Sequence, residues 1–274
     1  MTGPSRTLPP PTLNLFKNGL VLLALAPLAL FSTHGQLPSL TATQLLLALA
    51  SGIMGIAIAD NLYFRALNEL GAGRMGVVGN LYSPLVLLMG YAFLGERLGP
   101  WQWLGFALVA GGVLLVARPA GRRQAQPAHT LRGVLIGAAS IALMAVSIVM
   151  LKRVLEAQSL LWITLVRLLG AVGGLLSLAA WPRTRMHFRF DPGPVPWGQL
   201  VLAALCGQGL SMVLWLGGYK YAPAAVAAIL NESASVFLVI LGALWLREPL
   251  GRRALLGVTL TFTGIACMLA ARPP

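Results

Sequence analysis

The stretch G-Y-A-F-L-G-E-R-L-G at Gly90–Gly99 returns as G-A-L-W-L-R-E-P-L-G at Gly242–Gly251, with five of ten positions identical. The offset between the copies is 152 residues. The match extends to both sides, through the pairs Gly105/Gly257 and Gly112/Gly264 and, at an offset of 155, through Gly52/Gly207 and Arg65/Lys220. Because a repeat of this length sets the whole architecture, we take the chain as two copies of one unit.

The composition indicates an integral membrane protein. Of the 274 residues, 57% are hydrophobic and only 10% are charged, against about 25% charged in soluble domains. The net charge of +13 comes from cations that stand singly or in small groups between apolar runs. This arrangement is typical of membrane loop anchors and argues against nucleic-acid binding. Cys206 and Cys267 lie inside apolar runs, where we expect them to pack rather than to form a disulfide or a metal site.

The sequence predicts an all-α bundle of nine transmembrane helices. A bilayer-spanning helix needs about 20 residues, and continuous apolar runs exclude the alternation that a barrel requires. The predicted helices cover residues 14–31, 43–66, 74–94, 101–118, 133–151, 159–181, 198–219, 223–246 and 254–271.

The repeat divides the chain into residues 1–118 with four helices, a basic linker at 119–132, and residues 133–274 with five helices. When Lys17 is aligned with Arg167, the run at 133–151 has no counterpart in the first copy. We therefore expect a lost helix upstream of Met1, and a protein of nine helices is the alternative. Units with an odd number of helices are inverted relative to each other, with a pseudo-two-fold axis in the membrane plane, which is a common transporter plan.

The chain resembles the EamA-like transporters of the drug/metabolite transporter superfamily. The matching residues are A-D-N-L-Y-F-R-A-L at 59–67, Pro84, L-G-E-R-L at 94–98, G-F-A-L-V-A-G-G-V at 105–113, L-R-E-P-L at 246–250 and G-V-T-L-T-F-T-G-I at 257–265. This resemblance implies two inverted five-helix units, a central cavity between them, and export or exchange of small metabolites or drugs. The apparent lack of the first helix, which lines that cavity in the family, leaves an inactive truncated transporter as an alternative.

The charge bias of the loops predicts an orientation. Most Lys and Arg residues fall in the connections near 65–74, 118–132, 182–197 and 247–253 and at the N-terminus, a set that lies on one side of the membrane. The positive-inside rule places this set in the cytoplasm and the C-terminus outside. The family resemblance implies the opposite orientation, so the orientation stays open.

Four charged residues stand inside the apolar runs, where an unpartnered charge is costly. At a rise of about 1.5 Å per residue, Lys17 and Asp60 lie at similar depth near one face, and Arg167 and Glu232 match in depth nearer the other. These depths are compatible with two ion pairs, one in each half. For Arg167 and Glu232 we favour the pair, whereas for Lys17 and Asp60 we favour the simpler interpretation that both sit near helix ends and extend toward water.

The repeat places Asn80 opposite Glu232, and both fall near the midplane, where transporter sites usually lie. Pro84 is predicted to kink its helix there. The candidate substrate-binding or coupling residues are Glu232, Arg167, Asn231, Asn80, Asp60, Lys17, Tyr82 and Trp215. Stripes of small residues, such as Gly105 with Gly112, predict close helix packing, and a homodimer contact is their alternative use. We interpret Glu96 and Glu248 as charges at helix ends rather than as transport groups.

No enzyme site is predicted. His34, His129 and His187 fall in separate connections, and Asp60 and Glu232 differ in predicted depth, which argues against a proteolytic dyad. We expect a multi-pass transporter in the plasma (inner) membrane that handles a small-molecule substrate within the lipid bilayer, with no cofactor and no metal. A lipid-carrier flippase or an accessory membrane subunit is the alternative. The substrate and the coupling mode cannot be read from the sequence.

Overall fold

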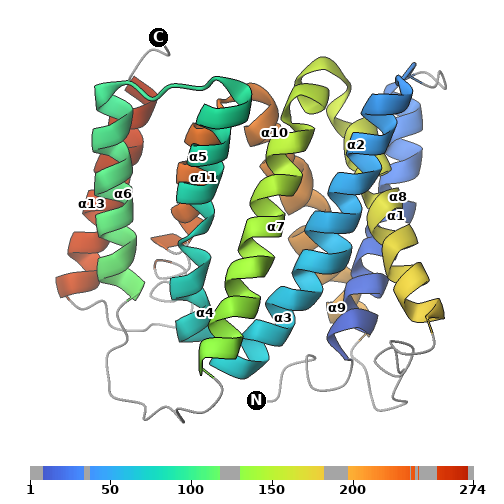
Figure 1. Cartoon of the computed structure of the whole chain (residues 1–274), viewed down its shortest axis with the longest axis horizontal. Helices are drawn as coiled ribbons and strands as arrows, with labels where there is room; N and C mark the ends of the chain where they lie inside the picture. Colours follow the sequence, from blue (N-terminus) through green and yellow to red (C-terminus); the bar gives the residue numbers. More distant parts are fainter. Residues whose placement is uncertain are drawn as a thin grey trace. The chain divides into compact units, whose positions relative to one another are not determined.

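The protein is described from a computed structural model (Figure 1). It describes residues 9–33, 38–117, 130–181, 197–234, 236–237, 240 and 252–270. The helices in this part of the chain are α1 (Pro10–Ser32), α2 (Ala42–Gly52), α3 (Ala59–Leu70), α4 (Ala72–Gly79), α5 (Tyr82–Met89), α6 (Pro100–Ala117), α7 (Thr130–Ala157), α8 (Leu160–Ala180), α9 (Trp197–Ala204), α10 (Ser211–Tyr221), α11 (Ala224–Glu232) and α13 (Arg252–Ala270). Three wider π-helical segments extend or join them: η2 (Ile53–Ile58), η3 (Gly90–Leu94) and η6 (Leu205–Leu210).

The predicted all-α membrane fold is confirmed. Each of the nine predicted runs is mostly helical where the structure describes it, and no strand occurs in the described ranges. Five described helices are long and apolar enough to cross a membrane, namely Pro10–Ser32, Ala42–Leu70, Leu131–Ala157, Leu160–Ala180 and Trp197–Tyr221. Two of the predicted runs are interrupted rather than continuous, namely 74–94 at Asn80–Leu81 and 223–246 at Ser233.

The chain folds into two compact units that do not coincide with the two sequence copies. Unit 1 comprises Met1–Ala66 with Ala139–Tyr221, and unit 2 comprises Leu67–Ala138 with Ala222–Pro274. Each unit therefore contains helices from both copies of the repeat.

In unit 1, small residues bring α2 and its extension against α8. A Cβ on Gly52 would overlap the backbone at Arg167, and one on Gly170 would overlap the backbone of Leu49. Because only glycine leaves room for this approach, the two helices pack with their backbones in contact, as the predicted small-residue seam requires.

In unit 2, α6 and α13 form a seam that is symmetric under exchange of the repeat. A Cβ at Gly264 would lie 2.8 Å from the carbonyl oxygen of Gly105, and one at Gly112 would lie 2.6 Å from the carbonyl oxygen of Gly257. The repeat relates Gly105 to Gly257 and Gly112 to Gly264, so each contact is the image of the other. Such self-complementary contacts are what a two-fold relation produces.

The equivalent helices also run in opposite directions within each unit. In Figure 1, α6 descends and α13 ascends in unit 2, whereas in unit 1 α2 descends into η2 and α9 ascends into η6. The opposite directions agree with an inverted repeat. The segments η2 and η6 begin at Ile53 and Leu205. At the offset of 155 that relates this part of the copies, Ile53 corresponds to Gln208, so the two segments overlap in the repeat without coinciding. Each copy thus carries a widened turn in this region, a feature that is frequent at functional sites.

Candidate functional site

Two helices of unit 2 are interrupted at the same position of the repeat. Leu81 N–H donates to the carbonyl of Val78 at 3.1 Å, and Ser233 N–H donates to that of Leu230 at 3.1 Å. These i−3 turns close α4 and α11 at positions 152 residues apart. Pro84 explains the first interruption, because it has no N–H with which to continue the ladder. Interrupted helices near the midplane are a common way to build a transporter site.

At the second interruption, the hydroxyl of Ser233 rather than a proline disturbs the helical hydrogen bonding. Its Oγ donates to the carbonyl of Leu230 at 2.6 Å, so backbone and side chain bind the same oxygen. Such local hydrogen bonds from serine compete with the helical ladder.

A cavity of about 160 Å³ lies between the interrupted helices and α6. Its walls are mostly apolar, and its polar groups are the side chains of Asn80, Ser83 and Glu232. The lining residues are Asn80, Ser83, Pro84, Phe106, Val109, Ala110, Ile229 and Glu232. Apolar walls with a few convergent polar groups are typical of small-molecule sites.

The Glu232 carboxylate is held at the beginning of α5. The Ser83 hydroxyl lies 2.7 Å from Glu232 Oε1 and 3.0 Å from the carbonyl oxygen of Ala228, and the Ser83 backbone N–H also hydrogen-bonds the carboxylate. Ser83 is the second residue of α5, so Glu232 faces the positive end of a helix dipole, which favours an anion. The described contacts of Glu232 come from Ser83, which leaves acceptor capacity for a ligand in the cavity.

The predicted residues of unit 2 separate into two groups. Asn80 and Glu232, which the repeat places at equivalent positions, line the same cavity. Asn231 is exposed on α11, and Tyr82 is buried with 7% of its surface accessible. Neither of these two lines this cavity, so their predicted role in substrate binding has no support from its geometry.

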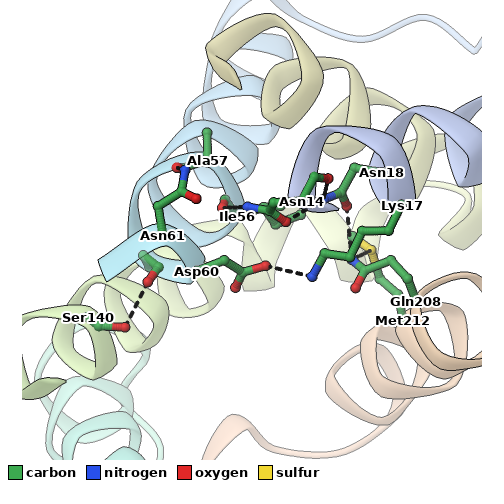
Figure 2. Close-up of polar contacts among 11 residues, drawn as sticks. Asn14, Lys17, Asn18, Ile56, Ala57, Asp60, Asn61, Ser140, Gln208 and Met212 are labelled. Carbon is green, nitrogen blue, oxygen red and sulfur yellow. Dashed lines mark hydrogen bonds and ion pairs between the residues drawn. The ribbon is translucent and has the colours of Figure 1, made fainter. Parts of the chain in front are cut away.

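Unit 1 contains a second polar centre, shown in Figure 2, and its core is an ion pair between Lys17 and Asp60. Lys17 Nζ lies 3.1 Å from Asp60 Oδ2, and each side chain is 19% exposed. Lys17 Nζ also lies 5.5 Å from the centre of the Phe64 ring, within cation–π range. The two charges neutralise each other within the bundle, so the structure shows the ion pair, which was the less favoured of the two interpretations.

Beside this pair, amides connect α1 to both π-helical segments of unit 1, a feature that the sequence reasoning missed. Asn14 Nδ2 donates to the carbonyl of Ile56 in η2 at 3.1 Å, and Gln208 Nε2 in η6 donates to Asn18 Oδ1 at 3.0 Å. Asn18 in turn donates to the side chain of Asn14 at 2.9 Å (Figure 2). The available signal was the spacing of Asn14, Lys17 and Asn18, which places three polar residues on one face of an apolar helix.

Arg167 and Trp215 also meet in unit 1. The Arg167 guanidinium lies 5.9 Å from the centre of the Trp215 ring, and its Nη2 donates to Ser147 Oγ at 3.2 Å. The side chain is buried, and its charge lies within electrostatic range of Asp60. Since Arg167 belongs to unit 1 and Glu232 to unit 2, the predicted pair between them stays a prediction.

Comparisons with known proteins point to membrane transport. The model of the EamA-like transporter family matches residues 1–118 and 131–270. An "Uncharacterized transporter in cobO 3'region" of Sinorhizobium sp is 32% identical over 103 residues, which are 38% of this chain and 73% of that protein. The UDP-N-acetylglucosamine transporter of Rattus norvegicus is 24% identical over 230 residues, which are 78% of this chain and 67% of that protein.

A solved crystal structure shares the fold. It superposes with a TM-score of 0.77 at 20% sequence identity, and the match covers 98% of this chain and 91% of the other.

Proposed function

Since the chain belongs to the EamA-like transporter family, we propose that it exports or exchanges small metabolites or drugs by alternating access. In this proposal, the carboxylate of Glu232 binds the substrate. The observation that carries this proposal is the cavity between the interrupted helices, which receives walls from both sequence copies. A site shared by the two copies is the place where an inverted-repeat transporter alternates its access. The plasma (inner) membrane is the proposed location.

The chemistry of the cavity favours a small amphipathic solute with a cationic amine. Its apolar wall, formed by residues such as Phe106 and Val109, suits an apolar body, and Glu232 suits an ammonium group. At about 160 Å³ the cavity is smaller than the roughly 300–1,000 Å³ of drug-sized sites. It therefore fits a small metabolite or one end of a larger drug.

The same chemistry disfavours a nucleotide sugar, although one relative is named a UDP-N-acetylglucosamine transporter. The residues that line this cavity include no Lys or Arg, and they include one carboxylate. A diphosphate placed here would meet repulsion from Glu232 rather than a cationic partner.

Counterflow in proteoliposomes tests the proposal. The panel pairs small amphipathic primary amines with their N-acetylated counterparts, which keep the body and lose the positive charge, and includes a UDP-sugar. We expect exchange of at least one amine and roughly tenfold slower exchange of its acetylated partner, the factor that corresponds to about 1.4 kcal/mol. Absence of exchange across the panel, or equal rates for a pair, would contradict the proposed substrate class, and a chemically altered substrate would indicate an enzyme.

A further inference from the structure

The stretch Gly90–Gly99 places a carboxylate at the beginning of a helix far away in the sequence. Glu96 Oε1 accepts the N–H of Ala224 at 2.7 Å, and Glu96 Oε2 accepts the N–H of Ala225 at 3.0 Å. These are the first two N–H groups of α11, and the N-cap Pro223 contributes no side-chain hydrogen bond. The charge of Glu96 therefore supplies the cap that α11 lacks locally.

The glycines of this stretch put Glu96 where it can cap α11. Gly95 has φ of +73°, a left-handed conformation that ends η3 and turns the chain back. Glu96 N–H then donates to the carbonyl of Gly90 at 3.2 Å, and a Cβ on Gly90 would lie 3.2 Å from Glu96 Oε2. A larger residue at position 90 would crowd the carboxylate. Glu96 is a charge at a helix end, as the sequence suggested. The helix end that it caps is the beginning of α11.

The two ends of α11 make different contacts. The helix has nine residues, begins at the N–H groups that Glu96 holds, and ends at Glu232, whose carboxylate is bound by Ser83. At about 1.5 Å per residue, its two ends lie only roughly 12 Å apart. A helix this short moves as a rigid body, so a shift at Ala224 is transmitted to Glu232.

We propose that Glu96 is a positioning residue for transport: by capping α11 it holds Glu232 in place against Ser83 and the cavity. The functional part of this inference rests on the proposed transport function, whereas the capping part does not. Glu96 needs no contact with the substrate in this role. A different capping residue at the beginning of α11 should therefore compensate for the loss of Glu96.

The test exploits Pro223, which has the backbone of a good N-cap, with φ −52° and ψ 144°. Aspartate is a strongly preferred N-cap residue because its side chain accepts the N–H of the second or third helical residue. Four proteins are compared: the parent, Glu96→Ala, Pro223→Asp, and the double variant Glu96→Ala/Pro223→Asp. Arg97→Ala serves as the matched control, since Arg97 is an exposed charge next to Glu96.

Two readouts are taken, amide hydrogen exchange of residues 224–232 and the maximal rate and KM of amine counterflow. In Glu96→Ala we expect exchange about tenfold faster at this segment and a maximal rate at least fivefold lower. In the double variant both return to within about twofold of Pro223→Asp, and Arg97→Ala matches the parent. Glu96→Gln, which keeps one acceptor oxygen, should fall between the parent and Glu96→Ala and covers the case in which Glu96→Ala does not fold.

The proposal is overturned if the double variant stays as slow as Glu96→Ala, because Glu96 then acts on substrate or proton directly. It is equally overturned if exchange of residues 224–232 is unchanged in Glu96→Ala, or if exchange accelerates while transport does not change. When no amine is transported by the parent, the proposed substrate fails, and the hydrogen-exchange arm still decides whether Glu96 caps α11.

Discussion

Two carboxylates inside the bundle have opposite surroundings. Asp60 in unit 1 contacts the Lys17 ammonium at 3.1 Å, and the charge of Arg167 also acts on Asp60. Glu232 in unit 2 is held by the hydroxyl and backbone amide of one serine and faces a cavity. Both residues carry the same charge within apolar runs, yet only Asp60 has a cationic partner among the described contacts of its unit.

This difference separates a structural role from a binding role. An ion pair offsets the desolvation cost of both charges, and removing one partner leaves the other buried and uncompensated. A carboxylate with spare acceptor capacity beside a cavity is instead available to a ligand. We therefore infer that the Lys17–Asp60 pair serves stability and that Glu232 serves the substrate.

The largest expected effect is on the stability of unit 1. Lys17→Met keeps an apolar stem and removes the ammonium, so Asp60 loses its partner. Because each side chain is 19% exposed, we expect a loss of about 2–3 kcal/mol in unfolding free energy, below the roughly 3–5 kcal/mol of fully buried pairs. Denaturant titration in detergent micelles measures this loss.

The control for this prediction removes both charges. Lys17→Met/Asp60→Leu should regain most of the lost stability, since replacing a buried pair by apolar residues is often neutral. A double variant as unstable as Lys17→Met would show that the unpartnered charge of Asp60 does not cause the loss of unfolding free energy.

A smaller effect is expected from Ser83→Ala, which probes the other carboxylate. This change removes the hydroxyl that lies between Glu232 Oε1 and the carbonyl of Ala228. We expect stability to fall by about 1–2 kcal/mol, the usual range when a buried partner is left unsatisfied. We also expect the KM for amines to change severalfold, because the carboxylate loses its orientation. Ser147→Ala in unit 1 is the matched control, and an equal change in KM there would contradict the assignment.

The smallest effect is expected from Asn80→Ala, which removes the amide side chain that lines the cavity. A lost neutral hydrogen bond is worth about 0.5–1.5 kcal/mol, so the KM should rise about two- to tenfold with the stability unchanged. Asn231→Ala, on the exposed face of α11, should leave the KM at the parent value. A larger effect at Asn231 than at Asn80 would place the substrate elsewhere.

Local and repetitive features of this site could be predicted from the sequence. The helices followed from apolar length, the matched depth of Lys17 and Asp60 made their ion pair a candidate, and the missing N–H of Pro84 predicted a kink close to the observed interruption. The repeat identified Asn80 and Glu232 as equivalent positions near the midplane, although it did not predict that both line one cavity. Each of these depends on spacing along one helix or on the offset between the copies.

The remaining contacts join residues that no spacing connects. Gln208 reaches Asn18 across 190 residues, and Glu96 reaches Ala224 across 128. Which polar side chains meet depends on how the helices pack, and the sequence of one chain does not specify that packing. The widened turns η2 and η6 were missed for the same reason, since their residues form an ordinary apolar run.

The most direct test of this account compares two isosteric changes, Glu232→Gln and Asp60→Asn, in one amine counterflow assay with parallel unfolding titrations. Each change removes a negative charge and keeps the shape of the side chain. The account predicts that Glu232→Gln lowers transport at least about tenfold, about 1.4 kcal/mol of barrier, at nearly unchanged stability. Asp60→Asn should lower stability while the folded fraction still transports. Parent-like transport by Glu232→Gln from about pH 6 to 8, where free carboxylates are ionised, would contradict the claim that the Glu232 carboxylate binds the substrate.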